Sequence, residues 1–151
     1  MGVRVRIQPS DGARALLARA DVALPRVPMR AGVRRALHAA GRRDGEFSIA
    51  LLDDDEIAAL NAEYLGHRAA TDVIAFALYE PPEPPLGDIY IGAAQALRQA
   101  RARRIAPAEE LTRLAVHGTL HVLGHDHPEG DARMQSDMWR LQEAIVLEVT
   151  S

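Results

Sequence analysis

The sequence contains no cysteine, and this absence excludes three kinds of chemistry at once. Disulfides, thiolate nucleophiles and cysteine-ligated metal sites all require a sulfur atom that the chain does not have. Any metal ion that the protein binds must therefore be held by histidine, aspartate or glutamate side chains.

The sequence also has no apolar run of the roughly 18 residues that a membrane-spanning helix requires. Its amino terminus, MGVRVRIQPS, alternates apolar and charged residues and lacks the apolar core of a signal peptide. We therefore expect a cytoplasmic protein with no membrane partner.

Lysine is missing as well, since all 18 basic residues are arginine. Arginine suits bidentate contacts with phosphate groups. A codon bias that spans the genome produces the same pattern, however, and we favour that interpretation. The formal net charge of −3 argues against a surface that is basic throughout, so any attraction for a polyanion must come from a local patch.

The 151 residues are 48% hydrophobic and 26% charged, values typical of one globular domain. Alternating segments predict strands, and apolar residues at helical spacing predict helices. The predicted strands are 3–8, 46–52, 71–78 and 86–92, and the predicted helices are 28–40, 53–64, 93–104, a segment from Pro107 into the histidines, and 131–148. We predict an α+β fold, with one domain over residues 1–151 and a small mixed β-sheet of about four strands packed with helices.

The last predicted helix carries a single apolar stripe, made of Met134, Met138, Leu141 and Ile145. A stripe at this spacing is typical of a helix that packs on a core. The proline-rich residues 79–85 cannot lie inside a sheet, and we interpret them as a surface loop.

Four of the six histidines are crowded into the segment HGTLHVLGHDH. His117 and His121 are four residues apart, which places both imidazoles on one helix face. Gly124 is expected to end this helix in a left-handed turn, after which His127 can return to the same face as a third ligand. His125 is the alternative third ligand. The spacing permits either histidine as the third ligand. We prefer His127 because the chain needs several residues after Gly124 to turn back toward the helix face.

Three neutral imidazoles with an open fourth position are typical of a catalytic zinc site. We therefore predict one Zn²⁺ at the end of a central helix, with His117, His121 and His127 as ligands. Iron, cobalt and nickel also occupy sites of this kind. A class of zinc proteases has the same histidine spacing, with a glutamate after the first histidine as the general base. Here that position is Gly118, which argues against peptide hydrolysis.

The histidine segment resembles the HGxLHLxGYDH signature of the YbeY family, bacterial endoribonucleases also called rRNA maturation factors. LNAEYLGHRAATDVIAF (60–76) is similar to the family's LNxxYRxKDKPTDVLSF segment, and LGDIYI (86–91) is similar to its LGDIxI strand. The resemblance extends from about residue 47 to the carboxyl terminus.

This resemblance implies a metal-dependent endoribonuclease, a hydrolase that cleaves single-stranded RNA, with the zinc carried by His117, His121 and His127. It implies a role in small-subunit (16S) rRNA 3′-end maturation and ribosome quality control. The implied partners are single-stranded rRNA, the small ribosomal subunit and its assembly factors.

The sequence departs from the family pattern after Tyr64, where the family has a functionally important arginine and this chain has Leu65. Arg68 is the nearest guanidinium and is our candidate catalytic residue, because it could hold a scissile phosphate by charge-assisted hydrogen bonds. A solvated loop arginine is the alternative interpretation. Asp126 either orients a ligand histidine or caps a turn.

A further candidate for RNA binding is the predicted helix 93–104. Arg98, Arg101 and Arg104 recur every three residues and would form a face for phosphate groups. The alternative is an exposed face balanced by Glu109 and Glu110. The six aromatic residues lie mostly in apolar patterns, so the sequence shows no platform for stacking bases.

Two other functions compete with the endoribonuclease hypothesis. The first is a ribosome-assembly factor in which zinc is mainly structural, a possibility to which Leu65 adds weight. The second is a zinc hydrolase of another substrate class, such as a peptide or a small phosphoester. Gly118 discriminates against the peptidase.

Overall fold

The computed structural model describes residues 2–125 and 136–151. The elements, in chain order, are β1 (Val3–Pro9), α1 (Asp11–Arg19), α2 (Arg26–Ala39), β2 (Gly45–Leu52), α3 (Asp54–Leu65), β3 (Val73–Ala77), β4 (Leu86–Gly92), α4 (Ala93–Arg103), α5 (Pro107–Val122) and α6 (Asp137–Thr150). Within the described ranges they form one small α+β domain with a four-stranded sheet and six helices. None of these helices is long and apolar enough to cross a membrane.

The sheet is mixed, with the strand order β1-β2-β4-β3. The strands β1, β2 and β4 are parallel, and β3 pairs antiparallel with β4 at one edge. Parallel neighbours require long crossover connections, which α1 and α2 supply between β1 and β2. The predicted small mixed sheet of about four strands is therefore confirmed.

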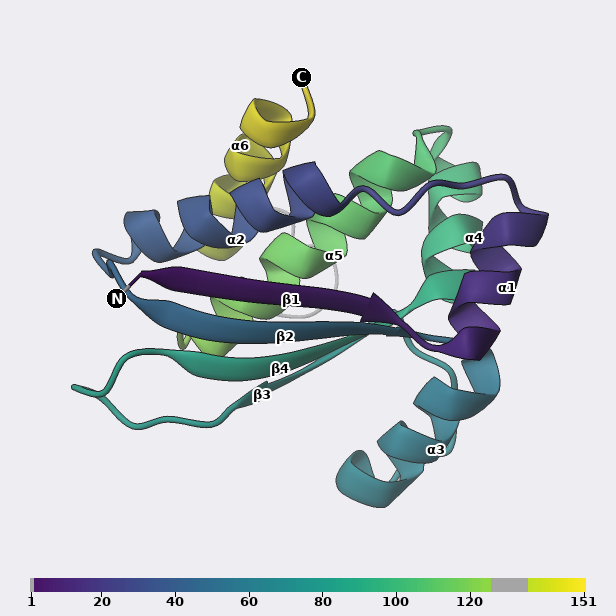
Figure 1. The fold of residues 1–151 in the computed structure, drawn as a ribbon, viewed down its shortest axis with the longest axis horizontal. Coiled ribbons are helices and arrows are strands. Elements are labelled where there is room, and N and C mark those ends of the chain that lie inside the picture. The colour runs from purple at the N-terminus through teal and green to yellow at the C-terminus, as the bar shows by residue number, and fades with distance from the viewer. Residues whose placement is uncertain (1, 126–135) are drawn as a thin grey trace.

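One face of the sheet is covered by helices and the other is largely open. Figure 1 shows α2, α5 and α6 on one side, while α3 lies on the other side. Alternate residues of β2 follow this division: Phe47, Ile49 and Leu51 are buried, whereas Glu46 and Ser48 are exposed. The main core therefore lies between the sheet and the α2–α5 layer.

Helix α5 is the central helix of the domain. Twelve of its sixteen residues are buried, because it packs against β3 and β4 and also against α2, α4 and α6. At Gly118 a Cβ atom would lie 2.7 Å from Ile89 and 3.3 Å from Val73, both in the sheet. At Gly32 of α2 a Cβ atom would lie 2.6 Å from Val116 of α5. The missing side chains let α5 approach its neighbours closely.

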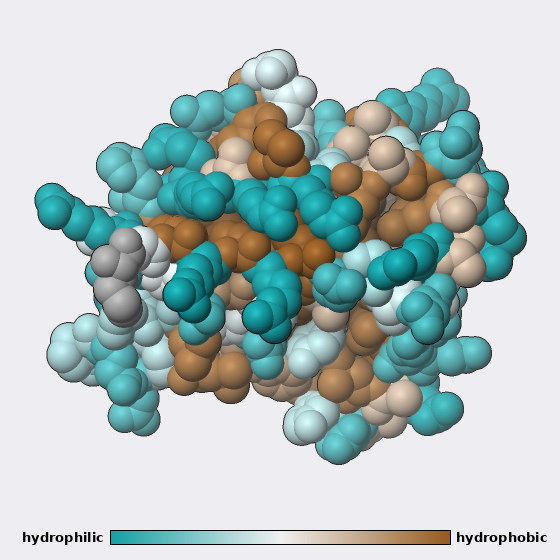
Figure 2. Space-filling view, viewed as in Figure 1, coloured by the Kyte–Doolittle hydropathy of each residue, from teal (hydrophilic) through white to brown (hydrophobic). Residues whose placement is uncertain are grey.

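The edge strand β1 is covered by arginines from α2. Arg30 Nε donates a hydrogen bond to Val5 O at 3.3 Å, and Arg26 Nη2 donates to Ile7 O at 3.5 Å. Unpaired backbone groups at a sheet edge otherwise invite pairing with another chain. Figure 2 shows hydrophilic side chains in front of an apolar band that crosses the middle of this face.

Helix α1 is an element that the sequence analysis missed. Gly12 in its first turn has a low helix propensity and suggests a loop. The helix forms because Ser10 caps it, accepting from Ala13 N–H at 3.1 Å and donating to Glu56 Oε1 at 2.6 Å. Gly12 also allows a close approach to Asp53, the N-cap of α3.

The other predicted elements are present with shifted ends, most visibly for α2 and β3, which differ from the predicted 28–40 and 71–78. The described part of the last helix is α6, and the predicted start at 131 and Met134 lie outside the described residues. Met138 and Ile145 are buried, and the half-buried Leu141 packs against the same core. The interpretation of this stripe as core is confirmed for these three residues.

Three of the aromatic residues gather on the open face of the sheet. Tyr64 of α3 packs edge-on against Phe76 of β3 with ring centroids 5.4 Å apart, and Phe76 packs against Tyr90 of β4 at 6.0 Å. Burial raises the pKa of Tyr90, and the nearby Asp88 adds to this. No local sequence pattern indicates this cluster, because its members come from three different elements.

We predict that Gly118→Ala lowers the free energy of unfolding by about 1–3 kcal/mol, because the added methyl group must displace Ile89 or the helix itself. Chemical denaturation measures the change. Ala144→Ser, at an exposed position of α6, is the control and should stay within about 0.5 kcal/mol of the parent. Equal stability of Gly118→Ala and the parent would contradict the close approach.

Candidate metal centre

Helix α5 presents two of the predicted metal ligands side by side. His117 and His121 have ring centroids 4.6 Å apart and ring planes at 76°. Their Nε2 atoms are 3.1 Å apart. Two ring nitrogens at this distance either share a proton in a hydrogen bond or face the same metal ion.

The separation of these nitrogens fits a shared zinc ion. Histidine nitrogens lie about 2.0–2.1 Å from zinc, so two ligands at a tetrahedral angle are about 3.3 Å apart. The 3.1 Å between the Nε2 atoms of His117 and His121 is close to this value. His117 is buried and His121 is half-buried, so the pair lies where the core meets the surface.

The second ring nitrogen of His117 is held by helix α6. His117 Nδ1 lies 2.6 Å from Gln142 Oε1, and Gln142 is only 1% exposed. Because a carbonyl oxygen can only accept, Nδ1 carries a proton, and in the neutral ring Nε2 then presents its lone pair. Metal-ligating histidines typically donate their other N–H in this way. The chemistry of the described donor pair therefore fits a metal ion.

The predicted third ligand, His127, lies outside the described residues, as does Asp126. Among residues 2–125 and 136–151, no group of three side chains that could hold a metal is found. His117 and His121 are thus the part of the predicted ligand set that the structure describes.

The turn that leads to His127 is described up to residue 125. Gly124 has φ +94°, and its N–H donates to His121 O at 3.0 Å. His125 N–H donates to Leu120 O at 2.9 Å. These two bonds form a Schellman motif, so the predicted left-handed turn at Gly124 is confirmed. His125, the alternative ligand, is half-buried.

Arg68 lies on the loop between α3 and β3, and not on α5, the helix that carries the histidines. Its side chain is exposed, and it forms no ion pair within the part of the chain that the structure describes. Asn61 anchors this loop by donating from Nδ2 to Ala69 O at 3.0 Å. Leu65, at the end of α3, is 52% exposed. The structure brings the two histidines together and leaves Arg68 facing solvent.

The predicted basic face of α4 is interrupted. Arg98 is paired with Asp54 of α3 through two hydrogen bonds of 3.1 Å. Arg104 follows the helix in a left-handed conformation with φ 58°. The charge of Arg98 is therefore balanced, but by Asp54 and not by the two glutamates that the sequence suggested.

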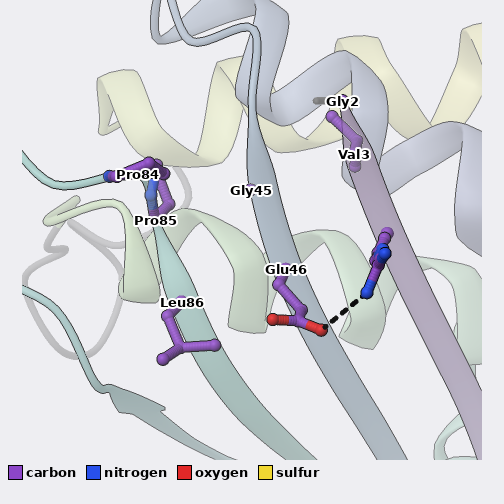
Figure 3. A pocket seen from close by; sticks show the side chains of 8 residues that line it. Gly2, Val3, Gly45, Glu46, Pro84, Pro85 and Leu86 are labelled. Carbon is purple, nitrogen blue, oxygen red and sulfur yellow. Dashed lines mark ion pairs between the residues drawn. The ribbon is translucent and has the colours of Figure 1, made fainter.

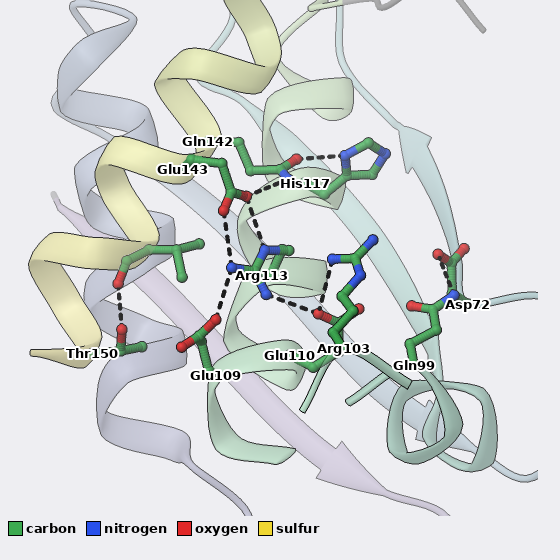
Figure 4. A network of polar contacts seen from close by, with 11 residues as sticks. Asp72, Gln99, Arg103, Glu109, Glu110, Arg113, His117, Gln142, Glu143 and Thr150 are labelled. Atoms are coloured by element: carbon green, nitrogen blue, oxygen red, sulfur yellow. Dashed lines mark hydrogen bonds and ion pairs between the residues drawn. The ribbon is translucent and has the colours of Figure 1, made fainter. Parts of the chain in front are cut away.

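A polar cluster centred on Arg113 connects α5 to α6 (Figure 4). Arg113 donates from Nε to Glu143 Oε2 at 2.8 Å and from Nη2 to Glu143 Oε1 at 2.9 Å. It also donates to Glu109 and to the buried Glu110, each at 2.9 Å. The spacing of Glu109 and Arg113, four residues apart on one helix, indicates an ion pair in the sequence itself. The ion pair of Arg113 with Glu143, 30 residues further along, has no such signal in the sequence.

The ionisation of this cluster follows from its contacts. Burial alone would lower the pKa of Arg113, but hydrogen bonds to its carboxylate partners raise it. Burial alone would raise the pKa of Glu143, but hydrogen bonds from Arg113 and Gln142 outweigh this effect and lower it. Arg113 and Glu143 are therefore both charged at neutral pH, and their opposite charges stabilise each other.

A separate hollow of about 560 Å³ lies at the amino ends of β1, β2 and β4. Its lining includes Gly2, Glu46 and Leu86, and Figure 3 shows an ion pair of Glu46 across it. That pair joins Glu46 to Arg4 at 3.8 Å, and both side chains are largely exposed. None of the lining residues belongs to α5 or α6, so this hollow is distinct from the histidine pair.

The fold and the histidine pair define a small α+β protein with a candidate metal centre on its central helix. Residues 21–150 match the protein family described as Endoribonuclease YbeY. The chain therefore belongs to the YbeY family of endoribonucleases, which are RNA-cleaving hydrolases by name.

Individual relatives agree with this assignment. The chain is 51% identical over 100 residues to the endoribonuclease YbeY of Anaeromyxobacter sp. (strain Fw109-5), an alignment that covers 64% of this chain and 52% of the relative. The chain thus spans about half of that relative's length. It is 40% identical over 140 residues to the one from Anaeromyxobacter dehalogenans, with 91% of this chain and 67% of the relative covered.

A solved structure also matches the fold. The solution structure of a Thermotoga maritima protein superposes with a TM-score of 0.61 at 27% sequence identity. The match covers 96% of this chain and 88% of that protein. The arrangement of sheet and helices described above is therefore shared along most of both chains.

We predict that the purified protein binds one zinc ion and that His121→Ala loses at least tenfold in zinc affinity, since it removes one of three nitrogen ligands. Competition with a chromophoric chelator measures the affinity. His38→Ala is the matched control, because His38 is exposed on α2 and should bind zinc like the parent. Equal zinc binding by His121→Ala and the parent would contradict the metal centre.

We predict that Glu143 stabilises the fold in a pH-dependent way. Its pKa is lowered from the ordinary 4.5, so its contribution is complete above that pH and is lost as the pH falls through the lower, folded-state pKa. Below about pH 4.5 the parent should therefore lose stability more steeply than Glu143→Gln, as measured by urea denaturation at several pH values. Glu148→Gln, which removes an exposed partner of Arg35, should keep the parent's slope. Parallel curves for the parent and Glu143→Gln would refute this assignment.

Proposed function

We propose that this chain is a zinc-dependent endoribonuclease specific for single-stranded RNA. The observation that carries this proposal is the pair of Nε2 atoms 3.1 Å apart on α5, with His117 oriented by Gln142. Membership of the YbeY family supplies the substrate class. The proposed domain is the whole chain, residues 1–151, acting as one metal-dependent endoribonuclease domain.

In the proposed site, His117, His121 and His127 hold one Zn²⁺. When bound, zinc supplies a Lewis acid for a phosphate oxygen and lowers the pKa of a bound water. Gln142 accepts the Nδ1 proton of His117, which keeps the Nε2 lone pair available. Because His121 is half-buried, an RNA strand can approach the site from the side on which His121 lies.

The surroundings of Gly118 support RNA over a peptide as the substrate. In zinc proteases of the same histidine spacing, the residue at this position is the general base. A side chain at residue 118 would point at Ile89 and Val73 of the sheet and not toward solvent. No proton acceptor can therefore be supplied from this position in the present fold.

Arg68 is proposed to hold the scissile phosphate. Its guanidinium is exposed on a loop that Asn61 anchors, and its N–H groups can donate to two non-bridging oxygens. Leu65, at the position of the family's arginine, has no donor to offer. Arg68 would thus stabilise the negative charge that develops on the phosphate during cleavage.

We propose the 3′ region of small-subunit (16S) rRNA as the substrate, cleaved in the cytoplasm during rRNA maturation and ribosome quality control. The partners would be the small ribosomal subunit and its assembly factors. The formal net charge of −3 supports a role for such partners, because a protein with this charge has no general attraction for RNA. A subunit that presents the strand would compensate for this.

A ribosome-assembly factor with a mainly structural zinc is the second candidate function. The exposed Leu65 favours it, since the guanidinium expected there is absent. In that case zinc removal would unfold the carboxyl-terminal half, and RNA would remain intact in the presence of the loaded protein. The cleavage experiment below distinguishes the two functions.

We predict that the zinc-loaded protein cleaves a single-stranded RNA carrying the 16S 3′ region and leaves the same sequence intact in a duplex. Cleavage should stop with chelator and return with zinc. His117→Ala should lose at least about 100-fold in rate, because it removes a metal ligand. Cleavage that persists unchanged in His117→Ala would identify a contaminating nuclease and refute the activity.

We predict that Arg68→Ala lowers the cleavage rate about 10- to 100-fold, the usual effect of removing a charge-assisted hydrogen bond. The matched control is Arg34→Ala, an exposed arginine on α2, which should cleave like the parent. In the Arg68→Ala background, Leu65→Arg should restore part of the rate. If Arg68→Ala and Arg34→Ala cleave equally well, Arg68 does not bind the scissile phosphate.

A further inference from the structure

We infer that Glu143 and Arg113 select the metal-binding tautomer of His117 by fixing the orientation of the Gln142 side-chain amide. This inference rests on the proposed role of His117 as a metal ligand. It assigns positioning roles to three residues that do not themselves contact the metal or the substrate.

The Gln142 amide lies between two groups that differ in what they can donate. Its Oε1 atom is 2.6 Å from His117 Nδ1, and its Nε2 atom donates to Glu143 Oε2 at 3.1 Å. An amide has an acceptor at one end and two donors at the other, so reversing it exchanges both interactions. The burial of Gln142 leaves no room for water to compensate for a wrong orientation.

Glu143 decides between the two orientations because an ionised carboxylate only accepts hydrogen bonds. The observed orientation places the amide NH₂ group against the carboxylate. The reversed orientation would place the amide oxygen of Gln142 against the negative charge of Glu143. The amide oxygen is therefore directed to His117, and the proton of that ring is placed on Nδ1.

Arg113 keeps the carboxylate of Glu143 ionised and in place. Its two hydrogen bonds, of 2.8 and 2.9 Å, engage both carboxylate oxygens, a bidentate geometry that fixes the plane of the group. The lowered pKa of Glu143 agrees with an acceptor that is ionised at neutral pH. The side chain of Arg113 is 10% exposed and that of Glu143 is 33% exposed, so the pair is partly shielded from competing solvent.

The consequence is a chain of contacts from Arg113 through Glu143 and Gln142 to His117 (Figure 4). With the proton on Nδ1, the Nε2 lone pair of His117 faces Nε2 of His121 at 3.1 Å. With the amide reversed, Nδ1 would accept from Gln142 and the proton would move to Nε2, where it blocks a metal. Helix α6 thus sets the chemical state of a ligand on α5.

The first test uses the full chain without metal and reads the tautomer directly. Ring nitrogen NMR should place the neutral His117 proton on Nδ1 in the parent. Glu143→Gln should shift the ring toward a mixture of tautomers, because two amides can pair in either orientation. Glu109→Gln is the matched control: it also removes a 2.9 Å partner of Arg113 but does not touch Gln142. A parent ring protonated on Nε2 would overturn the inference.

The second test measures zinc affinity by chelator competition, with zinc alone as the probe. Gln142→Leu should lose about 10- to 100-fold, the usual cost of removing the partner of a ligand histidine. Glu143→Gln should lose about three- to tenfold, and Glu109→Gln should bind like the parent. Equal affinities for Glu143→Gln and Glu109→Gln would overturn the inference, even if Gln142→Leu folds poorly.

The two tests separate this inference from the proposed function. If the parent shows the Nδ1 proton and Glu143→Gln disturbs it, but zinc-loaded protein leaves RNA intact, then the endoribonuclease proposal fails and the selection of the tautomer stands. If RNA is cleaved while the His117 ring and zinc affinity are the same in Glu143→Gln and Glu109→Gln, the function stands and the inference fails.

Discussion

Close packing of α5 against the sheet at Gly118 sets the position of the central helix, around which the other helices are arranged. With no side chain at this position, the helix lies directly on Ile89 and Val73, and its other faces meet α2, α4 and α6. A helix enclosed in this way exposes little of its surface. Most polar side chains that it carries are therefore paired inside the protein, because an unpaired buried polar group costs about 1–3 kcal/mol. The hydroxyl of Thr112 is an exception, since it has no hydrogen-bond partner among the described residues.

This requirement explains the polar contacts between α5 and α6. Arg113 meets Glu143, and His117 meets Gln142, so the two helices are joined by hydrogen bonds as well as by their apolar core. In a part-buried ion pair such as Arg113–Glu143, the lost hydration of both charges offsets part of the stability that their attraction contributes. The ion pair matters more for orientation: it fixes the side-chain amide of Gln142, which in turn fixes the tautomer of the His117 imidazole. The metal chemistry that we propose depends on that orientation as much as on the ligands.

Much of this protein was predictable from local pattern. The four strands, the carboxyl-terminal core stripe and the turn at Gly124 follow from periodicity and from glycine's access to positive φ, which depend on residues close in sequence. The elements that were missed depend on contacts between distant residues. Helix α1 contains Gly12, and its N-cap Ser10 also donates to Glu56, a contact that no short window contains. The same is true of Arg98 and its partner Asp54.

The candidate ligands could be identified from residue identity and helix geometry alone, because the chain has no cysteine and His117 and His121 are four residues apart. The contacts that orient these ligands depend instead on how distant parts of the chain pack together. Gln142 reaches His117 across 25 positions, and Glu143 reaches Arg113 across 30. Gly118 is a similar case. From the sequence it indicated that the general base of a zinc protease is absent, whereas in the fold it allows α5 to pack closely on the sheet. Such roles arise from which helices pack together, and packing is a property of the whole chain.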